Sequence, residues 1–450
     1  MAKKIVVIGA GTAGASAAFA ARKQDRNCEI TVLSAENLPT YSRCGIPFVI
    51  GGEIESFNKI VVFPQESFKS QKINLRLGTT GRALDIRDKT VHLTNGEKIS
   101  FDSLVIATGA IASVPQITGA NTPGVFVLRT IEDGKKILTS ASPGTKTVIN
   151  GASFIAIEAA EALERKGVEV TLVIRSRPLR SMLDEPVSKI VEQTLIKNGI
   201  TIITGNEISA VLGDSRVQGV KVGGETVAAD MVIMCTGVEP DVRLAKEAGL
   251  AIGEAGGIRV DARLMTSAPE IFAAGDCVEY PHAVSGRPFV SGLGTVATRQ
   301  GMVAGTNAAG GDLPAPPVLG ATVLELFDAH IGSVGLTEAS AKEAQFLALS
   351  AMTKHSSLPH YYPGGVPVTV RLIADSASCR ILGAQIVAPS GAGVAQRING
   401  LSIAILKGAT AQELANADFC YSPPVSDIWA AEAVAAQALL RRIETERNEK

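Results

Sequence analysis

A glycine-rich turn after an apolar strand constrains the fold of this chain more than any other feature. Residues 5–8 are apolar, residues 9–14 read GAGTAG, and an alanine-rich segment that should be helical follows. Glycines in such a turn let the backbone bend sharply and approach a pyrophosphate, whose charge the helix N-terminus stabilises. In this context the motif predicts a dinucleotide-binding unit. The residues expected to contact the cofactor are Gly9, Gly11, Thr12 and Gly14.

The same arrangement recurs once, which predicts a second dinucleotide-binding unit. Residues 147–149 form an apolar strand, the turn 151–156 follows, and a helix and the strand 169–174 come next. Two βαβ units in one chain indicate two Rossmann-like domains. Ser153 and Ala156 stand where glycines are expected, and a serine side chain at the phosphate counts against binding there. The contacts expected in this unit are Gly151, Ser153, Glu158 and Gly237.

Three later segments indicate that the second domain interrupts the first. The apolar strands 103–107 and 231–235 each lead into a Thr-Gly pair, and each should close one dinucleotide domain. A further short strand, 271–274, ends in a Gly-Asp pair beyond the second unit. The first domain is therefore expected to comprise residues 1–112 and 240–318, with the second domain, residues 113–239, inserted into it.

The C-terminal part of the chain predicts a third domain of a different class. A proline-rich linker lies at 313–317, and the segments 366–374 and 381–388 then alternate like antiparallel strands, with helices after them. Residues 319–450 are expected to form an α+β domain. The whole chain is thus predicted to be an α/β protein with two Rossmann-like domains and this third domain.

Charge and hydropathy narrow the range of partners. The formal net charge of −1 gives no long-range attraction to nucleic acid or to an anionic membrane. No stretch reaches the ~18 apolar residues of a transmembrane helix, and the N-terminus lacks the apolar region of a signal peptide. The six cysteines form no CxxC pair and no metal-ligand spacing. We expect a cytoplasmic protein that binds a small molecule and no nucleic acid, membrane or metal.

The residues after the second strand of each unit help to decide which dinucleotide each unit binds. An acid that binds the adenosine ribose is expected about 20 residues after the first glycine turn, but Ser34 stands there and Glu36 is the nearest substitute. In the second unit this region holds Arg175, Arg177 and Arg180. Guanidinium groups suit the 2′-phosphate of NADP, so NADPH is favoured over NADH without excluding it. The alternative for these arginines is a solvated basic turn.

Cys44 is the cysteine whose position indicates chemistry. It lies in the motif SRCGIPF, just after the second strand of the first unit, and the Gly-Ile-Pro that follows suits a helix start. A thiol at a helix N-terminus near Arg43 should have a depressed pKa and react as a thiolate. The alternative is a buried structural cysteine. Four other cysteines fit that alternative because they lie in or beside apolar strands: Cys28, Cys235, Cys277 and Cys379.

Six motifs in one order make the chain similar to a known family. They are GAGTAG, SRCGIPF, LVIATGA, CTGVEPD, IFAAGD and YSPPVSDIW. Over nearly its whole length the sequence resembles the coenzyme A-disulfide reductases, NADH oxidases and NADH peroxidases within the pyridine nucleotide-disulfide oxidoreductases. The resemblance implies that the first domain binds FAD, the second binds NAD(P), and the third is the dimerisation domain of a homodimer. It also implies cofactor contacts for Arg43, Thr108, Gly109 and Asp276.

Departures from other members narrow the implied activity. Glutathione-reductase-like members carry a CxxxxC pair and a C-terminal His–Glu couple, whereas here Cys44 stands alone and the last histidine is His360. Peroxidases and water-forming oxidases share a histidine in the first glycine loop, where this chain has Thr12. Coenzyme A-disulfide reductases use tyrosines of the third domain, and YYPG and YSPP match that pattern. The tyrosines so implied are Tyr361, Tyr362 and Tyr421, with aromatic packing at a dimer interface as the alternative.

These residues lead to an expected reaction. NAD(P)H would reduce the FAD, electrons would pass to Cys44, and its thiolate would attack a sulfur of the substrate. Tyr361 or Tyr421 would then protonate the leaving thiolate. The resemblance implies coenzyme A as the thiol, carried as a disulfide or persulfide, or polysulfide as substrate. The contacts expected for it are Arg22, Lys23 and Ser42.

Two rival functions remain at this point. An NADH oxidase or peroxidase would cycle Cys44 through a sulfenic acid and reduce oxygen or peroxide. The missing loop histidine argues against this rival. A reductase component that passes electrons to a partner protein seldom needs a cysteine at this place, so Cys44 argues against that function.

Overall fold

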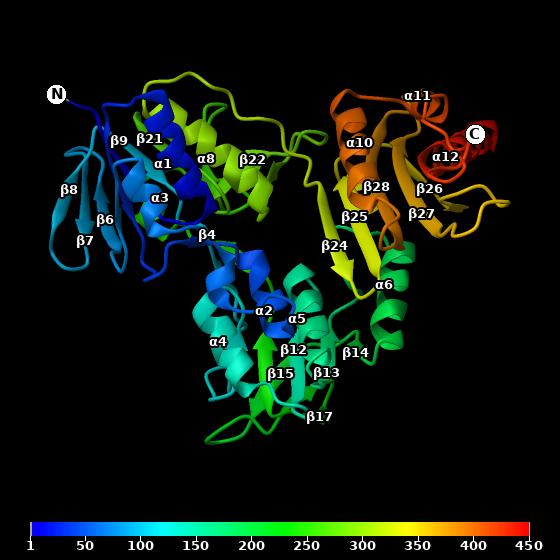
Figure 1. Cartoon of the computed structure of the whole chain (residues 1–450), viewed down its shortest axis with the longest axis horizontal. Coiled ribbons are helices and arrows are strands. Elements are labelled where there is room, and N and C mark those ends of the chain that lie inside the picture. The colour runs from blue at the N-terminus through cyan, green and yellow to red at the C-terminus, as the bar shows by residue number, and fades with distance from the viewer. Residues whose placement is uncertain (1, 450) are drawn as a thin grey trace.

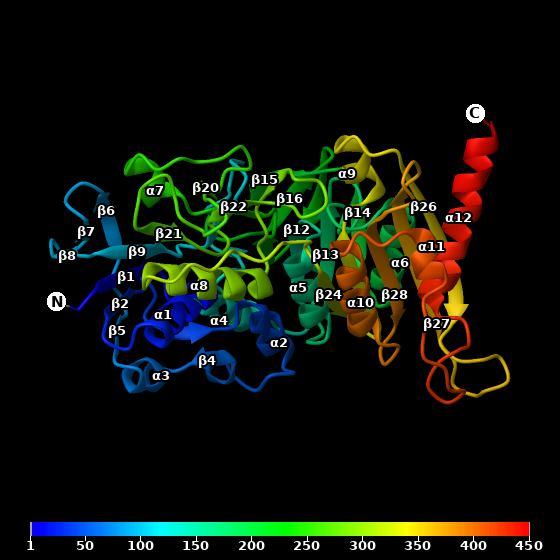
Figure 2. The ribbon, with the colours of Figure 1, turned by 90° about the horizontal axis from the view of Figure 1, so that it is seen from above.

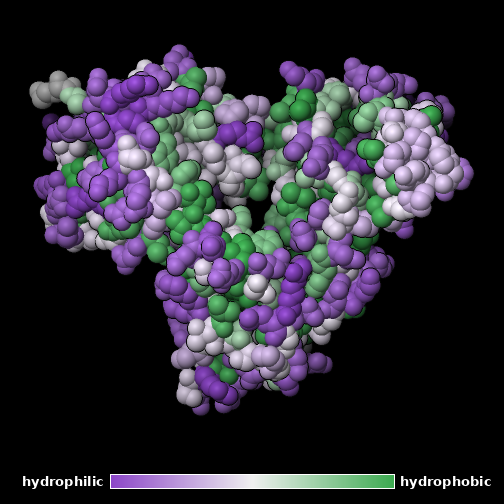
Figure 3. All heavy atoms as spheres, in the orientation of Figure 1, coloured by the Kyte–Doolittle hydropathy of each residue, from purple (hydrophilic) through white to green (hydrophobic). Residues whose placement is uncertain are grey.

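The molecule has three lobes, and each lobe is built on one five-stranded sheet (Figure 1). The structure is a computed structural model and describes residues 2–449. On the face drawn in Figure 3, hydrophobic residues gather along the inner sides of the lobes, around a central hollow. The expected fold class, two Rossmann-like regions and an α+β C-terminal region, is confirmed.

The first sheet is parallel, in the strand order β21-β9-β1-β2-β5. Its strand β21 follows the second dinucleotide unit in the sequence. This confirms the expectation that the short strand before the Gly-Asp pair returns to the first sheet. The bounds are β1 (Lys4–Ile8), β2 (Glu29–Leu33), β5 (Ile73–Arg76), β9 (Ser103–Ile106) and β21 (Ile271–Ala273), with helices α1 (Thr12–Gln24) and α8 (Gly294–Ala308) beside them.

The second sheet repeats this design in the order β11-β18-β12-β13-β14, again with parallel pairs only. Its elements are β11 (Val125–Val127), α4 (Ile131–Ser140), β12 (Lys146–Asn150), α5 (Phe154–Glu164), β13 (Glu169–Ile174), α6 (Glu185–Lys197), β14 (Thr201–Thr204) and β18 (Met231–Met234). The chain crosses between the two lobes twice, at β10 (Ala110–Ala112) and β19 (Val238–Pro240), and these crossings pair antiparallel. The predicted domain boundaries, after residue 112 and after residue 239, fall at these paired strands and stay predictions.

The third sheet is antiparallel, in the order β24-β25-β28-β27-β26, and helices cover it at the far end of the molecule (Figure 2). The two segments predicted to be strands here are β27 and β28. The bounds are β24 (Thr322–Leu326), β25 (Ala329–Gly335), α9 (Glu338–Glu343), β26 (Ala348–Ser356), β27 (Pro367–Asp375), β28 (Ile381–Pro389), α10 (Val394–Leu406), α11 (Ala411–Ala415) and α12 (Ala431–Glu449).

Smaller elements surround the three sheets. They are β3 (Thr40–Tyr41), α2 (Ile46–Gly51), β4 (Val61–Phe63), α3 (Gln65–Ser70), β6 (Gly81–Asp85), β7 (Thr90–Leu93), β8 (Lys98–Ser100), β15 (Ile208–Leu212), β16 (Gly219–Val222), β17 (Glu225–Ala228), α7 (Arg243–Glu247), β20 (Ile258–Arg259), β22 (Val278–Pro281) and β23 (Pro288–Phe289). No helix within residues 2–449 is long and apolar enough to cross a bilayer. The same residues contain no cluster of three or more histidine, cysteine or acidic side chains suited to a metal ion.

Helices α1 and α8 pack at unusually short range, because small residues line both of them. A Cβ atom added at Gly301 would lie 2.2 Å from the carbonyl oxygen of Ala13, and one at Gly305 would lie 2.0 Å from that of Ala17. Both distances are far below van der Waals contact, so α8 needs glycine at these two positions. This contact holds α1, and with it the first glycine turn, against the sheet.

Replacing Gly305 by alanine should therefore destabilise the protein. The added methyl group must push α8 away from α1, and overpacking of this kind costs typically about 1–3 kcal/mol. Thermal unfolding of the purified protein measures the change as a lower Tm. Gly400→Ala in α10 is the matched control, since no atom lies within 4 Å of its added Cβ, and alanine there should be neutral or stabilising. Equal Tm values for the two variants would contradict the packing argument.

Candidate functional site

The first glycine turn has the geometry of a phosphate-binding loop. Gly9 has φ +108°, and a Cβ there would lie 2.1 Å from the carbonyl oxygen of Ala107 on the neighbouring strand end. A Cβ at Gly14 would meet the Gly9 carbonyl oxygen at 1.8 Å, so α1 starts directly against the turn. Beside Gly11 no protein atom lies within 4 Å of the added Cβ. This open space faces the start of α1, at Thr12, where backbone N–H groups are free to bind a pyrophosphate.

The second turn repeats the first at Gly151. Its φ is +126°, and its added Cβ would lie 2.2 Å from the carbonyl oxygen of Cys235. Ser153 is the N-cap of α5, and its Oγ is buried without a hydrogen-bond partner among residues 2–449. A buried hydroxyl of this kind needs a partner, and a phosphate oxygen at a helix N-terminus supplies one. The serine that counted against binding in the sequence thus fits a phosphate in the structure.

Two further predicted contacts lie where strands of the parallel sheets end. Gly109 and Gly237 have φ +74° and +125°, conformations that favour glycine. The hydroxyl of Thr108 donates to the carbonyl oxygen of Asp241 at 2.6 Å and so ties the first crossing between the lobes to the second. These residues stay predicted cofactor contacts.

Cys44 lies in a short 3-10 turn, Arg43–Gly45, that runs straight into α2, with a proline in the first turn of that helix. A Cβ at Gly45 would lie 2.6 Å from a methyl carbon of Ile60, so the chain next to the cysteine is tightly packed. Helix α2 in turn packs on α5 and α4 of the second lobe. Cys44 is exposed, as expected for a reactive thiol, and α2 places it where the first and second lobes meet (Figure 1).

The charges around Cys44 correct one expectation. Although the residue has exposed surface, the protein atoms around its sulfur partly desolvate it and raise the pKa of the thiol. The carboxylates of Glu158 and Asp276 raise this pKa further, while Arg129 lowers it. The expected depression by Arg43 is therefore wrong. The Arg43 guanidinium binds the Glu36 carboxylate at 2.6 Å and the carbonyl oxygen of Arg129 at 2.7 Å.

Both carboxylate oxygens of Glu36 accept hydrogen bonds from protein groups. Besides Arg43 it accepts a hydrogen bond from the Tyr41 hydroxyl at 2.5 Å. Ser34, at the expected ribose position, accepts a hydrogen bond from the Glu36 backbone N–H with its Oγ. These contacts give Glu36 a role in holding the chain before Cys44, and a ribose contact from Ser34 or Glu36 stays a prediction.

Arg129 is a site residue that the sequence analysis missed. It follows β11 in the second lobe, donates to the Ala110 carbonyl oxygen at 3.2 Å, and forms an ion pair with Asp276 of the first lobe at 2.8 Å. Its charge also acts on Cys44. A lone arginine after a short strand carries no motif, so only the fold connects it with Asp276 and the cysteine.

The residues predicted to bind coenzyme A have different surroundings. Arg22 is bound through its guanidinium to backbone carbonyl oxygens of Gln71, Arg26 and Cys28 at 2.8 Å each. This arrangement closes the C-terminal end of α1 and occupies the side chain. Lys23 is exposed, and Ser42 is half-buried beside Cys44. Contacts of all three with a substrate stay predictions.

The tyrosines of the third lobe form a pair. The hydroxyls of Tyr361 and Tyr421 are 2.7 Å apart, and both side chains are exposed, as is that of Tyr362. The hydrogen bond with Tyr361 raises the pKa of Tyr421. Figures 1 and 2 place these loops at the far end of the third lobe, well away from α2, so a single chain does not bring them to Cys44.

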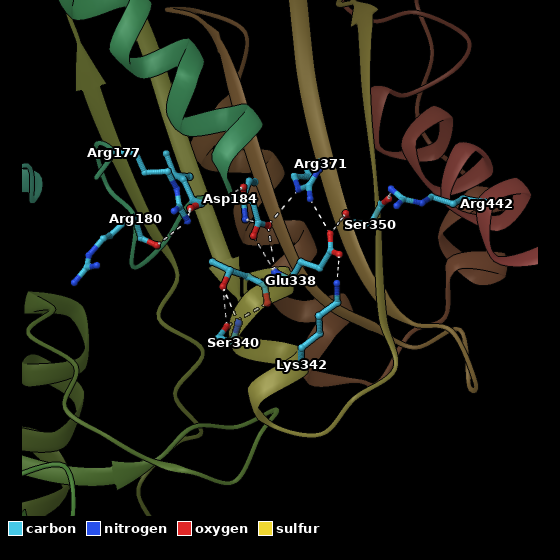
Figure 4. Close-up of polar contacts among 12 residues, drawn as sticks. Arg177, Arg180, Asp184, Glu338, Ser340, Lys342, Ser350, Arg371 and Arg442 are labelled. Atoms are coloured by element: carbon cyan, nitrogen blue, oxygen red, sulfur yellow. Dashed lines mark hydrogen bonds and ion pairs between the residues drawn. The ribbon is translucent and has the colours of Figure 1, made fainter. Parts of the chain in front are cut away.

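The three arginines after β13 differ in what they contact. Arg175 is exposed and forms a surface ion pair with Glu207 at 3.1 Å. Arg177 donates to the carbonyl oxygens of Leu183 at 3.2 Å and Arg180 at 3.4 Å. The Arg180 side chain is exposed and points away from these contacts (Figure 4). Arg175 and Arg180 are thus available to a ligand, whereas Arg177 shapes the loop.

The remaining cysteines divide as predicted. Cys28, Cys235, Cys277 and Cys379 are buried, and Cys420 joins Cys44 as an exposed thiol. Burial raises the pKa of Cys235 to about 12, which keeps that thiol protonated and inert.

Comparisons with known proteins extend over the whole chain. Residues 3–301 match the family described as pyridine nucleotide-disulphide oxidoreductase, and residues 324–433 match the dimerisation domain of that family. An NADH oxidase of Methanocaldococcus jannaschii is 37% identical over 98% of this chain and 99% of its own. An NAD(P)H coenzyme A polysulfide/persulfide reductase of Pyrococcus horikoshii is 34% identical over 98% of this chain and 99% of its own.

Solved structures give the same result. An NAD-dependent persulfide reductase from A. fulgidus matches with a TM-score of 0.95 and 34% identity, over 98% of this chain and 84% of that one. An engineered water-forming NADPH oxidase bound to NADPH matches with a TM-score of 0.94 and 26% identity, over 99% of this chain and all of that one. The chain is therefore a member of the pyridine nucleotide-disulphide oxidoreductase family, with both its oxidoreductase region and its dimerisation domain.

Proposed function

We propose that this protein reduces a disulfide or persulfide of coenzyme A, or polysulfide, at the expense of NAD(P)H, with Cys44 as its single redox-active cysteine. The observation that carries the proposal is the isolation of Cys44. It is exposed, and the other exposed cysteine, Cys420, lies in the third lobe beside Tyr421. A cysteine without a nearby partner in its own chain forms a disulfide only with a sulfur from outside that chain, and this sulfur would come from the substrate.

The reaction requires two steps at Cys44. Its thiolate attacks one sulfur of the substrate, a mixed disulfide forms, and the other substrate sulfur leaves as a thiolate that takes up a proton. Two electrons then cleave the mixed disulfide and release the second thiol together with the Cys44 thiolate. Bound FAD would supply these electrons after accepting hydride from NAD(P)H. The first glycine turn and Asp276 would hold the FAD, and the second turn with Ser153 would hold the nicotinamide nucleotide.

Tyr361 and Tyr421 would act on Cys44 of the other subunit in a homodimer. In one chain they lie at the far end of the third lobe, and that lobe carries the family's dimerisation domain. In a hydrogen-bonded tyrosine pair, one hydroxyl can donate while the other stabilises the resulting oxygen, which suits protonation of a leaving thiolate. The persulfide and polysulfide reductases among the relatives support a sulfur compound as the substrate.

An NADH oxidase is the second candidate, favoured by the 37% identical relative that bears this name. In that reaction peroxide would oxidise Cys44 to a sulfenic acid, which two electrons and two protons reduce to thiol and water. Steady-state turnover with oxygen, peroxide, coenzyme A disulfide and polysulfide distinguishes the candidates. The sulfur substrates should give the highest kcat/KM, and a clear preference for oxygen would favour the oxidase.

NADPH is proposed as the preferred reductant. The engineered NADPH oxidase carries alanine in place of a glycine and, eighteen positions later, alanine, arginine and serine in a row. This chain has Ala156 and, at the same interval, Ile174, Arg175 and Ser176. In both proteins the first of the three positions lacks an acid and the second is arginine. Such an arrangement removes the carboxylate that would repel a 2′-phosphate and supplies a guanidinium to bind it.

Cys44→Ser should abolish reduction of the sulfur substrates, because serine is a far weaker nucleophile than a thiolate. We expect kcat/KM for coenzyme A disulfide to fall by at least about 100-fold, with FAD content and stopped-flow flavin reduction by NADPH preserved. Cys420→Ser, which replaces the other exposed cysteine, should leave turnover within about twofold. Full disulfide and persulfide turnover in the Cys44 variant would refute the mechanism.

Arg175→Ala should raise KM for NADPH by about tenfold and leave KM for NADH nearly unchanged, because only NADPH carries the 2′-phosphate. This variant is preferred to one at Arg177, whose loss would disturb the loop itself. Glu207→Gln tests the same contact in the opposite direction. It frees Arg175 from its surface ion pair, so NADPH should bind equally well or better. If the wild type strongly prefers NADH and neither change alters that preference, the arginines form only a solvated basic turn.

Glu158→Gln should make Cys44 reactive at lower pH. Burial, followed by the charge of Glu161, raises the pKa of Glu158 to about 7, and above that pH its carboxylate raises the pKa of Cys44. Glutamine removes this charge, so the thiolate should form at lower pH. Alkylation of the reduced holoprotein by iodoacetamide, followed across pH, should rise earlier than in the wild type. Glu164→Gln, in the same helix, should match the wild type, and an unshifted profile in both variants would contradict the coupling.

A further inference from the structure

The loop between β13 and α6 carries the three arginines and is anchored at its middle to the second glycine turn. The backbone N–H of Leu179 donates to the carbonyl oxygen of Ala152, next to Ser153, at 2.9 Å. The hydroxyl of Ser188 in α6 donates to the Pro178 carbonyl oxygen at 2.6 Å. These bonds fix the loop beside the phosphate-binding turn without using an arginine.

The end of this loop is anchored to the third lobe through Asp184. The Asp184 carboxylate is buried and accepts hydrogen bonds from Gln385 Nε2 at 2.8 Å and from Arg371 Nε at 3.2 Å. It also accepts from the Glu338 backbone N–H at 3.2 Å, and the Asp184 N–H donates to Gln385 Oε1 at 2.9 Å. Four contacts thus join one residue of the arginine loop to β27, β28 and α9 (Figure 4).

The charges of this cluster are balanced across the lobes. Arg371 lies between two carboxylates, Asp184 and Glu338, and binds Glu338 at 2.9 Å. Glu338 is also bound by Lys342 at 2.6 Å on its solvent side and by the Ser350 hydroxyl. The side chains of Arg371 and Asp184 are 11% and 8% exposed, so their pairing is little screened by water, and loss of one partner leaves a buried charge.

We propose that Asp184 is a positioning residue for NADPH selectivity: the third lobe, through this contact, holds the arginine loop at the distance the 2′-phosphate requires. The proposal rests on the NADPH preference proposed above. Loss of the anchor would let residues 180–184 shift, because they lie beyond the bond of Leu179 to Ala152, and the shift of Arg180 would weaken contacts with the 2′-phosphate. The glycine turn and Ser153, which would bind the phosphates common to NADH and NADPH, keep their own anchors.

Asp184→Asn tests this role in the flavin-loaded protein. Within residues 2–449 every partner of the Asp184 carboxylate is a hydrogen-bond donor. In either orientation of an asparagine side chain, its NH2 group would therefore face another donor and lose a hydrogen bond. Isothermal titration should show Kd for 2′,5′-ADP raised about tenfold and Kd for 5′-AMP changed by less than about twofold. The ratio of the two Kd values is the readout that general destabilisation would not move.

Two further variants keep the test decisive. Gln385→Leu removes two of the four contacts and should change the ratio in the same direction, which covers the case of an unfolded Asp184 variant. Lys342→Gln alters the solvent side of the cluster only and should leave both Kd values as in the wild type. Equal weakening of both ligands by folded Asp184 and Gln385 variants would overturn the positioning role alone. A wild type that binds 2′,5′-ADP no better than 5′-AMP would overturn the NADPH preference, and the positioning role with it.

Discussion

Close contact between backbone atoms at the two glycine turns is the constraint on which the rest of the structure depends. Gly9 lies against the carbonyl oxygen of Ala107, and Gly151 against that of Cys235, so in each lobe the turn is locked to the end of a neighbouring parallel strand. A side chain at either position would separate the turn from the sheet. The short contact of α1 with α8 extends this constraint to the opposite side of the helix. As a result, the N-termini of α1 and α5, which are proposed to bind phosphate, have fixed places relative to the carboxyl ends of their sheets, where ligands bind in folds of this class.

Burial and the charges that this frame places around Cys44 set the pKa of its thiol. Two carboxylates, Glu158 of the second lobe and Asp276 of the first, raise the pKa of its thiol, and Arg129 lowers it. Arg129 also forms an ion pair with Asp276. The other carboxyl group is that of Glu158. Its pKa of about 7 means that the charge next to Cys44 changes near neutral pH. The second lobe therefore affects the pKa of the cysteine through Glu158, and it also contacts the helix after the cysteine through the packing of α2 on α5.

The third lobe contributes more than a dimerisation surface. The buried contact of Asp184 with Arg371 and Gln385 connects it to the loop on which nucleotide choice is proposed to depend. Its tyrosine pair, by contrast, lies in loops at the far end of the lobe, so the proposed action on Cys44 would require a second copy of the chain. By these two proposals, one lobe would act on the nucleotide site of its own chain and on the cysteine site of its partner.

The sequence by itself determined the two dinucleotide units, the late return of the chain to the first sheet and the isolation of Cys44. These features depend on short-range patterns, since glycine spacing and apolar runs dictate local backbone geometry. It misjudged the pKa of Cys44, because the sequence neighbour Arg43 binds Glu36 instead, and Glu158 and Asp276 come from distant segments. It also missed Arg129 and the anchoring of the arginine loop by Asp184. Only the tertiary structure decided these, because electrostatic effects and buried hydrogen bonds depend on distance in space, which residue spacing along the chain does not give.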